Sequence, residues 1–208
     1  MESLKTIQDF LIKYSGKKYR KPASNEDDEM ISISRNGKDA REDFTVLGKI
    51  VLNRLPNFTM GRCSKWLSMN QVIPNYFWIE FKEKGFETCP SSISLAIKKV
   101  KYEIYLYVAV EIKDQNANEE NFKNHNRILN LPLNNDKLYY SSDGEDFFNL
   151  GTDASYVGDL INKGIIKKVR IQQNIEISNN DGDIINNIID AIKILQPYYN
   201  CIIKNFSN

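Results

Sequence analysis

The chain has 208 residues, and its 28 Lys and Arg against 27 Asp and Glu leave a formal charge of +1 at pH 7. This balance excludes the strongly basic composition of an obligate nucleic-acid coat, so any DNA-binding face has to be local. Hydrophobic residues make up 41% of the chain and charged residues 26%, which excludes wholesale disorder. The length suits one domain with a real hydrophobic core better than two small ones.

Cysteine and histidine usage bears on the compartment and on metal sites. Cys63, Cys89 and Cys201 are odd in number and far apart, and His125 is the single histidine. This pattern is typical of a reducing cytosol and argues against a disulfide framework or a structural zinc site. No stretch approaches about 18 apolar residues, and residues 1–20 lack the apolar run of an export signal. We therefore expect a cytoplasmic protein that does not span a membrane.

Two helices are predicted in the N-terminal quarter. The first apolar stripe recurs at intervals of three and four residues and ends before Gly16; it comprises Leu4, Ile7, Leu11 and Tyr14. Residues 17–43 mix a basic and an acidic cluster with few apolar residues, which favours a mobile linker or a long loop. A second stripe ends before Pro56 and comprises Phe44, Leu47, Val51 and Leu55. These patterns divide the chain into an N-terminal helix and polar linker over 1–43 and an α+β domain over 44–208.

From residue 76 the hydrophobic period changes to two, which is typical of half-buried strands. Three alternating runs joined by short turns predict an antiparallel meander over 76–82, 93–97 and 103–113. Downstream, the patterns predict a helix over 118–129, a strand over 137–142, a helix over 156–161, a strand over 165–177 and a closing helix over 183–199. The fold class is therefore α+β: a mainly antiparallel, twisted sheet with flanking helices and a long C-terminal helix.

The sequence Glu111-Ile112-Lys113 is the strongest indication of an enzyme. Many metal-dependent nucleases place a Glu-x-Lys on a core strand, where the carboxylate holds a divalent ion and the lysine orients water. Such a site needs a second carboxylate, and no aspartate lies between Asp43 and Asp114. Glu80-Phe81-Lys82 repeats the tripeptide, which illustrates how readily an alternating strand produces it. We therefore interpret Glu111 and Lys113 as solvent-facing strand charges and keep the nuclease as an alternative.

Other catalytic arrangements lack their parts. Cys/His or Ser/His/Asp chemistry would have to use His125, which its spacing from Phe122 and Leu129 places beside the buried face of a helix. No phosphate-binding glycine loop is present, so no nucleotide cofactor is expected. Because no catalytic constellation is complete, we expect a binding protein rather than an enzyme, without cofactor or metal.

One loop-to-strand passage and one strand turn combine cations with aromatic rings. Residues of these types contact DNA phosphates and stack on unpaired bases. The predicted nucleic-acid-binding residues are Arg62, Lys65, Trp66, Tyr76, Trp78, Lys98, Lys99 and Lys101. The alternative interpretation is that both tryptophans belong to the core and that the lysines only solubilise an edge or a turn.

The segment from Tyr76 to the C-terminus resembles the N-terminal DNA-recognition domains of McrB-type, modification-dependent restriction systems. The resemblance rests on the strand Trp78-Ile79-Glu80-Phe81, the aliphatic strands at 93–97 and 104–112, and a closing helix that ends Leu195-Gln196-Pro197-Tyr198-Tyr199. It implies binding of DNA that carries a modified base flipped into a pocket, with a separate AAA+ motor and nuclease as partners. The same element order is similar to the uncharacterised bacterial YktB family, which implies no established activity.

The leading hypothesis is therefore a cytoplasmic DNA-binding specificity domain of a bacterial restriction or defence system. Its expected ligand is DNA, including methylated DNA, and its expected partner is a motor or nuclease subunit. Two alternatives stay open: a metal-dependent nuclease that uses Glu111 and Lys113, and a domain whose surface binds another protein.

Overall fold

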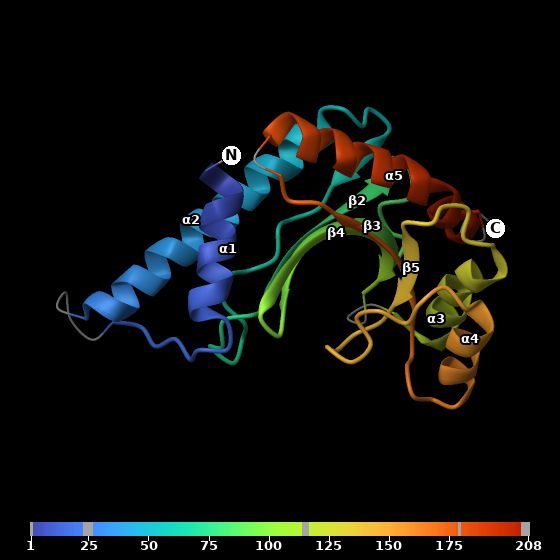
Figure 1. Ribbon diagram of the computed structural model, residues 1–208, viewed down its shortest axis with the longest axis horizontal. Helices are drawn as coiled ribbons and strands as arrows, with labels where there is room; N and C mark the ends of the chain where they lie inside the picture. The colour runs from blue at the N-terminus through green and yellow to red at the C-terminus, as the bar shows by residue number, and fades with distance from the viewer. Residues whose placement is uncertain (1, 23–26, 114–116, 179, 205–208) are drawn as a thin grey trace.

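An antiparallel sheet of six strands forms the centre of the computed structural model, in which residues 2–22, 27–113, 117–178 and 180–204 are described (Figure 1). The strands are β1 (Phe58–Met60), β2 (Tyr76–Glu83), β3 (Ser91–Val100), β4 (Glu103–Ile112), β5 (Leu138–Ser141) and β6 (Arg170–Ile175). Their order across the sheet is β1-β2-β3-β4-β6-β5. The predicted meander is confirmed as β2, β3 and β4, and so is the α+β class.

The strand register gives the sheet two chemically different faces. On one face Phe77, Ile79 and Phe81 of β2 alternate with the residues of the other face and are fully buried. Paired residues of neighbouring strands share a face, so Phe77 lies beside Ile97 and Ile79 beside Leu95. The second face, which we call the open face, carries polar and aromatic side chains at the intervening positions.

Three helices cover the apolar face (Figure 1): α1 (Glu2–Tyr14), α2 (Asp28–Leu52) and α5 (Asp181–Ile203). Their buried side chains join those of the strands in one continuous core. The remaining helices lie near β5 and β6 and comprise α3 (Glu119–His125), the 3-10 helix η2 (Asn126–Asn130) and α4 (Ala154–Asn162). The open face is thus left to loops rather than to helices.

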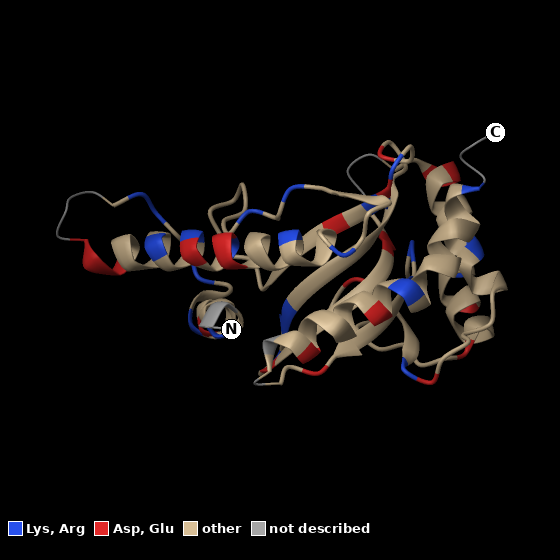
Figure 2. Ribbon diagram, turned by 90° about the horizontal axis from the view of Figure 1, so that it is seen from above, with Lys and Arg blue, Asp and Glu red and all other residues tan. Residues whose placement is uncertain are grey.

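The linker predicted over 17–43 is wrong from residue 28 onward, because α2 begins at Asp28 and the position 43/44 lies inside it. The buried positions continue toward the N-terminus as Ile33, Gly37 and Ala40, at helical spacing. Two of these three residues are too small to register as an apolar stripe. Figure 2 shows Lys and Arg alternating with Asp and Glu along the length of α2, the mixture that suggested a linker.

Gly37 is small for a structural reason. A Cβ atom at this position would lie 2.5 Å from Trp66 Cε3, so only glycine lets the indole ring pack on the backbone of α2. The contact ties the loop that precedes β2 to the N-terminal helix pair.

Other boundaries shifted while the elements stayed. The predicted strand 165–177 shortens to β6, and the predicted helix 118–129 divides into α3 and η2. The closing helix extends to Asp181–Ile203, and its inward face is buried through Ile184, Ile185, Ile188, Ile192, Leu195 and Tyr199. Gly164 follows α4 with φ +69, the left-handed conformation expected of a glycine at a helix end. Among the helices of the described residues, none combines the length and apolarity that a membrane span requires.

Candidate functional site

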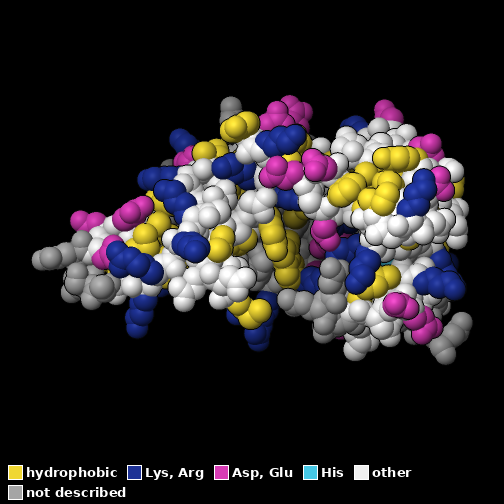
Figure 3. All heavy atoms as spheres, turned by 90° about the horizontal axis from the view of Figure 1, so that it is seen from below, with side chains coloured by type: hydrophobic (Ala, Val, Ile, Leu, Met, Phe, Trp, Pro, Cys, Tyr) yellow, Lys and Arg dark blue, Asp and Glu magenta, His cyan; other side chains and the backbone are white. Residues whose placement is uncertain are grey.

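A cavity of about 360 Å³ lies on the open face, a volume within the range of small-ligand sites. We call it the open-face pocket. Its lining comes from β2, β3, β4 and the first residue of β6, and from residues just outside the ends of β4, β5 and β6. It comprises Tyr76, Trp78, Ala96, Lys98, Tyr107, Glu111, Ile112, Lys113, Asp143, Lys168 and Arg170. Figure 3 views the molecule from below; hydrophobic side chains come to the surface in the middle of this side, with charged side chains of both signs around them.

The strand register creates the hollow. Ala96 on β3 is paired with Trp78 on β2 and with Tyr107 on β4, so all three side chains point to the open face. A methyl group between two large rings leaves a gap that a larger residue would fill. Two residues after Ala96 on β3, Lys98 lies between its paired residues Tyr76 and Tyr105. Its ammonium closes this end of the pocket.

A loop that follows β5 forms one wall of this face. Phe148 packs its ring against Tyr105 and Tyr107, with centroid separations of 4.6 and 5.9 Å. These three rings form a second small core with Ala96, Val100 and Ala109. Phe148 therefore fixes the Tyr105 and Tyr107 rings at this wall of the open face.

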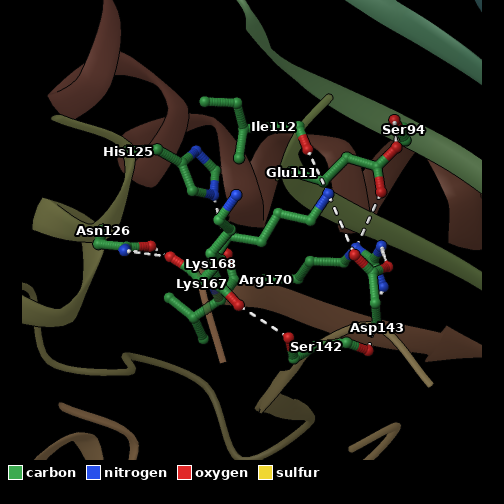
Figure 4. Close-up of polar contacts among 11 residues, drawn as sticks. Ser94, Glu111, Ile112, His125, Asn126, Ser142, Asp143, Lys167, Lys168 and Arg170 are labelled. Carbon is green, nitrogen blue, oxygen red and sulfur yellow. Dashed lines mark hydrogen bonds and ion pairs between the residues drawn. The ribbon is translucent and has the colours of Figure 1, made fainter. Parts of the chain in front are cut away.

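Arg170 organises the charges of the pocket (Figure 4). Its Nε lies 2.9 Å from Glu111 Oε2, and its Nη2 pairs with Asp143. The side chain of Lys168 lies 3.1 Å from Asp143 Oδ2 and donates to the backbone oxygen of Ile112. Burial alone would raise the pKa of the Asp143 carboxyl, but Arg170 and Lys168 outweigh it and hold that pKa below its ordinary value.

Lys98 differs from the other pocket cations. Its side chain is 9% exposed, and within the described ranges it forms no ion pair with a carboxylate. Its Nζ lies 5.5 Å from the centroid of the Phe148 ring. Burial lowers the pKa of the Lys98 ammonium and the nearby Arg170 lowers it further, while the carboxylates of Asp143, Glu145 and Glu111 oppose the shift without reversing it. A desolvated cation that lines a pocket in this way favours an anionic or hydrogen-bond-accepting ligand.

Lys113 covers the ring of Trp78. Its Nζ lies 3.3 Å from the ring centroid and 2.8 Å from Glu80 Oε2. Burial lowers the pKa of the Lys113 ammonium, while Glu80 opposes that shift. A planar ligand that stacked on this face of the ring would have to displace the ammonium, which the flexible four-carbon stem of lysine permits.

The geometry at Glu111 does not resemble an open metal site. Glu111 accepts a hydrogen bond of 2.6 Å from Ser94 and pairs with Arg170, so both carboxylate oxygens are occupied. The missing second carboxylate does come from elsewhere in the chain, as Asp143, but Arg170 lies between the two. No cluster of three or more His, Cys, Asp or Glu suited to a metal ion occurs in the described part of the chain.

His125 is fully buried behind this face. Its Nε2 lies 2.8 Å from the backbone oxygen of Val169, and its Nδ1 lies 2.9 Å from Ser91 Oγ. The neutral ring with its proton on Nε2 satisfies both contacts, since Nδ1 then accepts from the Ser91 hydroxyl. Both side chains are inaccessible to solvent, so the pair holds α3 against β3 and β6 and does not face a substrate.

Acid should therefore destabilise the fold through His125. Burial lowers the pKa of its imidazole from 6.5 to about 4, and Lys168 and Arg170 add to the lowering, while the Val169 carbonyl opposes it. The unfolded chain binds the proton first, so this stabilisation is complete above pH 6.5 and is lost as the pH falls toward 4, by roughly 3 kcal/mol. Urea unfolding across this pH window should show a steeper pH slope for the parent than for His125→Gln. Equal slopes would contradict the assignment.

Three of the eight predicted nucleic-acid-binding residues, Tyr76, Trp78 and Lys98, meet in the open-face pocket. The loop before β2 runs along the strand's outer edge, where Ser64 hydrogen-bonds the backbone of Trp78 in both directions. Arg62 and Lys65 are exposed on this loop, and neither is among the residues that line the pocket.

The other three predicted residues lie elsewhere. Trp66 packs between α1 and α2, in ring contact with Phe10 and Tyr19, and does not reach the pocket. Lys99 and Lys101 lie at the turn between β3 and β4, at one end of the sheet.

Sequence reasoning missed Tyr107, Asp143, Lys168 and Arg170. The alternation of β4 places Tyr107 on the same face as Glu111, which was a usable signal. Nothing local in the sequence indicates that β6 pairs with β4, and this pairing brings Arg170 to Glu111.

Comparison of the chain with protein-family models, with curated proteins and with solved structures returned no match.

Proposed function

We propose that this chain is a DNA-binding specificity domain that receives an extruded base in the open-face pocket. The observation that carries the proposal is the coincidence of aromatic walls and a buried cation that has no direct ion pair among the described residues, all in one cavity. Trp78 and Tyr107 flank the space above Ala96, and Lys98 closes one end. Flat rings with an adjacent hydrogen-bond donor are what a planar, heteroatom-rich base needs.

The surroundings of the pocket favour a nucleic acid over a free small molecule. Arg62 and Lys65 are exposed along the edge of β2, and Lys101 is exposed at the nearby sheet end. These cations are exposed on segments that adjoin β2 and β3, two of the strands that line the pocket, although the whole chain carries a charge of only +1. Such an arrangement suits phosphate contacts that position a duplex while the cavity reads one base.

The finer part of the proposal concerns the base and the partners. Through the resemblance to McrB-type recognition domains, we propose a modified base, methylated cytosine or adenine, as the ligand. A restriction or defence system would then supply the motor and nuclease activity as separate polypeptides or domains. The nuclease alternative gains no support from the pocket, because Arg170 and Ser94 already occupy the Glu111 carboxylate.

DNA binding by a Lys98→Gln variant tests the proposal. We expect Lys98→Gln to weaken binding of the best-bound among unmodified, cytosine-methylated and adenine-methylated duplexes by about tenfold or more, in line with the loss of a hydrogen bond from a charged donor. The slope of log affinity against log salt should change little, because the proposal gives the phosphate contacts to other cations. Anisotropy titrations at two salt concentrations measure both quantities. Because Lys98 is buried, the melting temperature of the variant is measured alongside.

Lys193→Gln is the matched control, since Lys193 is exposed on α5 and therefore lies on the covered side of the sheet. Arg62→Ala with Lys65→Ala compares the loop with the pocket. A folded parent that binds none of the three duplexes at low salt would overturn the proposal. Binding that Lys98→Gln leaves unchanged but the loop variant abolishes would move the site to the edge of β2.

A further inference from the structure

The turn between β3 and β4 presents an unusually exposed aromatic ring. Val100 pairs with Glu103, so Lys101 and Tyr102 alone form the hairpin loop. Tyr102 is 95% exposed. A tyrosine so far out in solvent contributes almost no burial to folding, so its ring is free to pack against a partner.

The backbone of this turn is strained. Lys101 adopts φ +54, a conformation that two-residue hairpin loops normally assign to Gly, Asn or Asp. Lysine carries a Cβ atom that makes this region unfavourable, and such strain gathers at functional positions. The turn thus places the Lys101 ammonium and the exposed Tyr102 ring at the tip of β3 and β4. A glycine at position 101 would adopt the same backbone conformation with less strain.

Further cations surround the tip. Lys99 donates to the backbone oxygen of Ile12, which brings the C-terminal end of α1, with Lys13 and Lys17, beside the hairpin. Lys101 lines a surface depression with Gly16, which follows that helix. The acidic neighbours are Glu145 in the same depression, Glu103, which accepts from Tyr105, and Glu29, which lies 4.0 Å from Lys17. Cations outnumber the carboxylates, so the tip suits a polyanion.

The same two strands link the tip to the open-face pocket. Tyr105 is paired with Lys98, and Tyr102 lies three residues before Tyr105, in the turn that precedes β4. Three residues of extended chain span at most about 10 Å. A duplex that placed a base in the pocket would therefore have its stack close to the hairpin tip.

We propose that Tyr102 is a wedge that enters the DNA base stack and fills the gap left by the extruded nucleotide. Side chains that part a base step kink the duplex and offset the unstacking cost through new contacts. Lys101 and Lys99 would hold the flanking phosphates during insertion. This inference rests on the proposed DNA-binding function and assigns a second contact outside the pocket.

The test compares duplex and single-stranded DNA, since only a duplex needs a wedge. The probes are the best-bound of the three duplexes above and one of its strands alone. We expect Tyr102→Ala to weaken duplex binding at least about fivefold, in line with the loss of one base-aromatic stack, and to change single-strand binding less than about twofold. Tyr102→Phe keeps the ring and should bind both like the parent.

Tyr156→Ala is the control, because Tyr156 is also exposed but lies on α4, away from the hairpin. A 2-aminopurine next to the extruded position should brighten with the parent and with Tyr102→Phe but not with Tyr102→Ala. If Tyr102→Ala binds the duplex as the parent does, or loses duplex and single strand equally, the wedge is overturned while the proposed function stands. A parent that binds no duplex overturns both.

Discussion

Replacing Ile188 by alanine is expected to lower the free energy of unfolding by about 2 to 5 kcal/mol. Ile188 lies in the middle of α5 and is fully buried. Its helix packs across β3, β4 and β6, so the lost methyl groups would leave a cavity between helix and sheet. Neither layer can close that cavity easily, because the strands are fixed by pairing on both sides.

Urea unfolding measures this effect, and the matched control is Asn187→Ala, an exposed position on the same helix. The control should change stability by less than about 0.5 kcal/mol. An unchanged midpoint for Ile188→Ala would mean that α5 does not dock on the sheet, and the apolar face would then lack the cover that the structure gives it.

Arg170→Met is expected to cost about 3 to 5 kcal/mol, for an electrostatic reason rather than a packing one. Methionine keeps much of the volume but leaves Glu111, whose side chain is 12% exposed, without its cation. The Ser94 hydroxyl and more distant cations do not replace that contact. Removing one partner of a buried ion pair leaves the other charge, here the Glu111 carboxylate, without compensation in surroundings that solvate it poorly.

A double-mutant cycle isolates this contribution. Glu111→Gln in the Arg170→Met background removes the stranded charge, so the double variant should be more stable than Arg170→Met alone. Thermal and urea unfolding of the four proteins give the coupling energy. Losses that simply add would show that Glu111 and Arg170 are not energetically linked, against the geometry of the pocket.

The strands could be read from the sequence because alternation is a local signal. Phe77, Ile79 and Phe81 reveal their face within a few residues, and the same alternation put Tyr76 and Trp78 together on the other face. The N-terminal half of α2 was not predicted as a helix because two of its inward positions are Gly37 and Ala40, which do not contribute to a hydrophobic pattern. Tertiary contact with Trp66 selects those small residues, and contact partners are not visible in one sequence.

The charged half of the site could not be predicted for a related reason. Arg170 and Glu111 are far apart in the chain and meet only because β6 inserts between β4 and β5. Asp143 follows β5 and joins them from a third element. Local patterns assign a residue to a strand but do not indicate which strand it pairs with. A site whose residues come from several paired strands can therefore not be predicted from them.

The two tryptophans illustrate the same limit. Trp66 and Trp78 lie 12 positions apart in one aromatic, basic passage and were assigned the same role. The structure separates them, since Trp66 packs on α2 and Trp78 lines the pocket. This separation also offers a direct way to observe the site.

The most direct test is the fluorescence of Trp78 during a DNA titration. The chain has two tryptophans, so Trp66→Phe leaves Trp78 as the single emitter, and Trp78→Phe leaves Trp66. A base that stacks in the open-face pocket should quench Trp66→Phe in a saturable way, with the same midpoint as the anisotropy of labelled DNA, while Trp78→Phe emission stays constant. Binding seen by anisotropy without any change in Trp78 emission, or with the change in Trp66 instead, would contradict the assignment of this pocket.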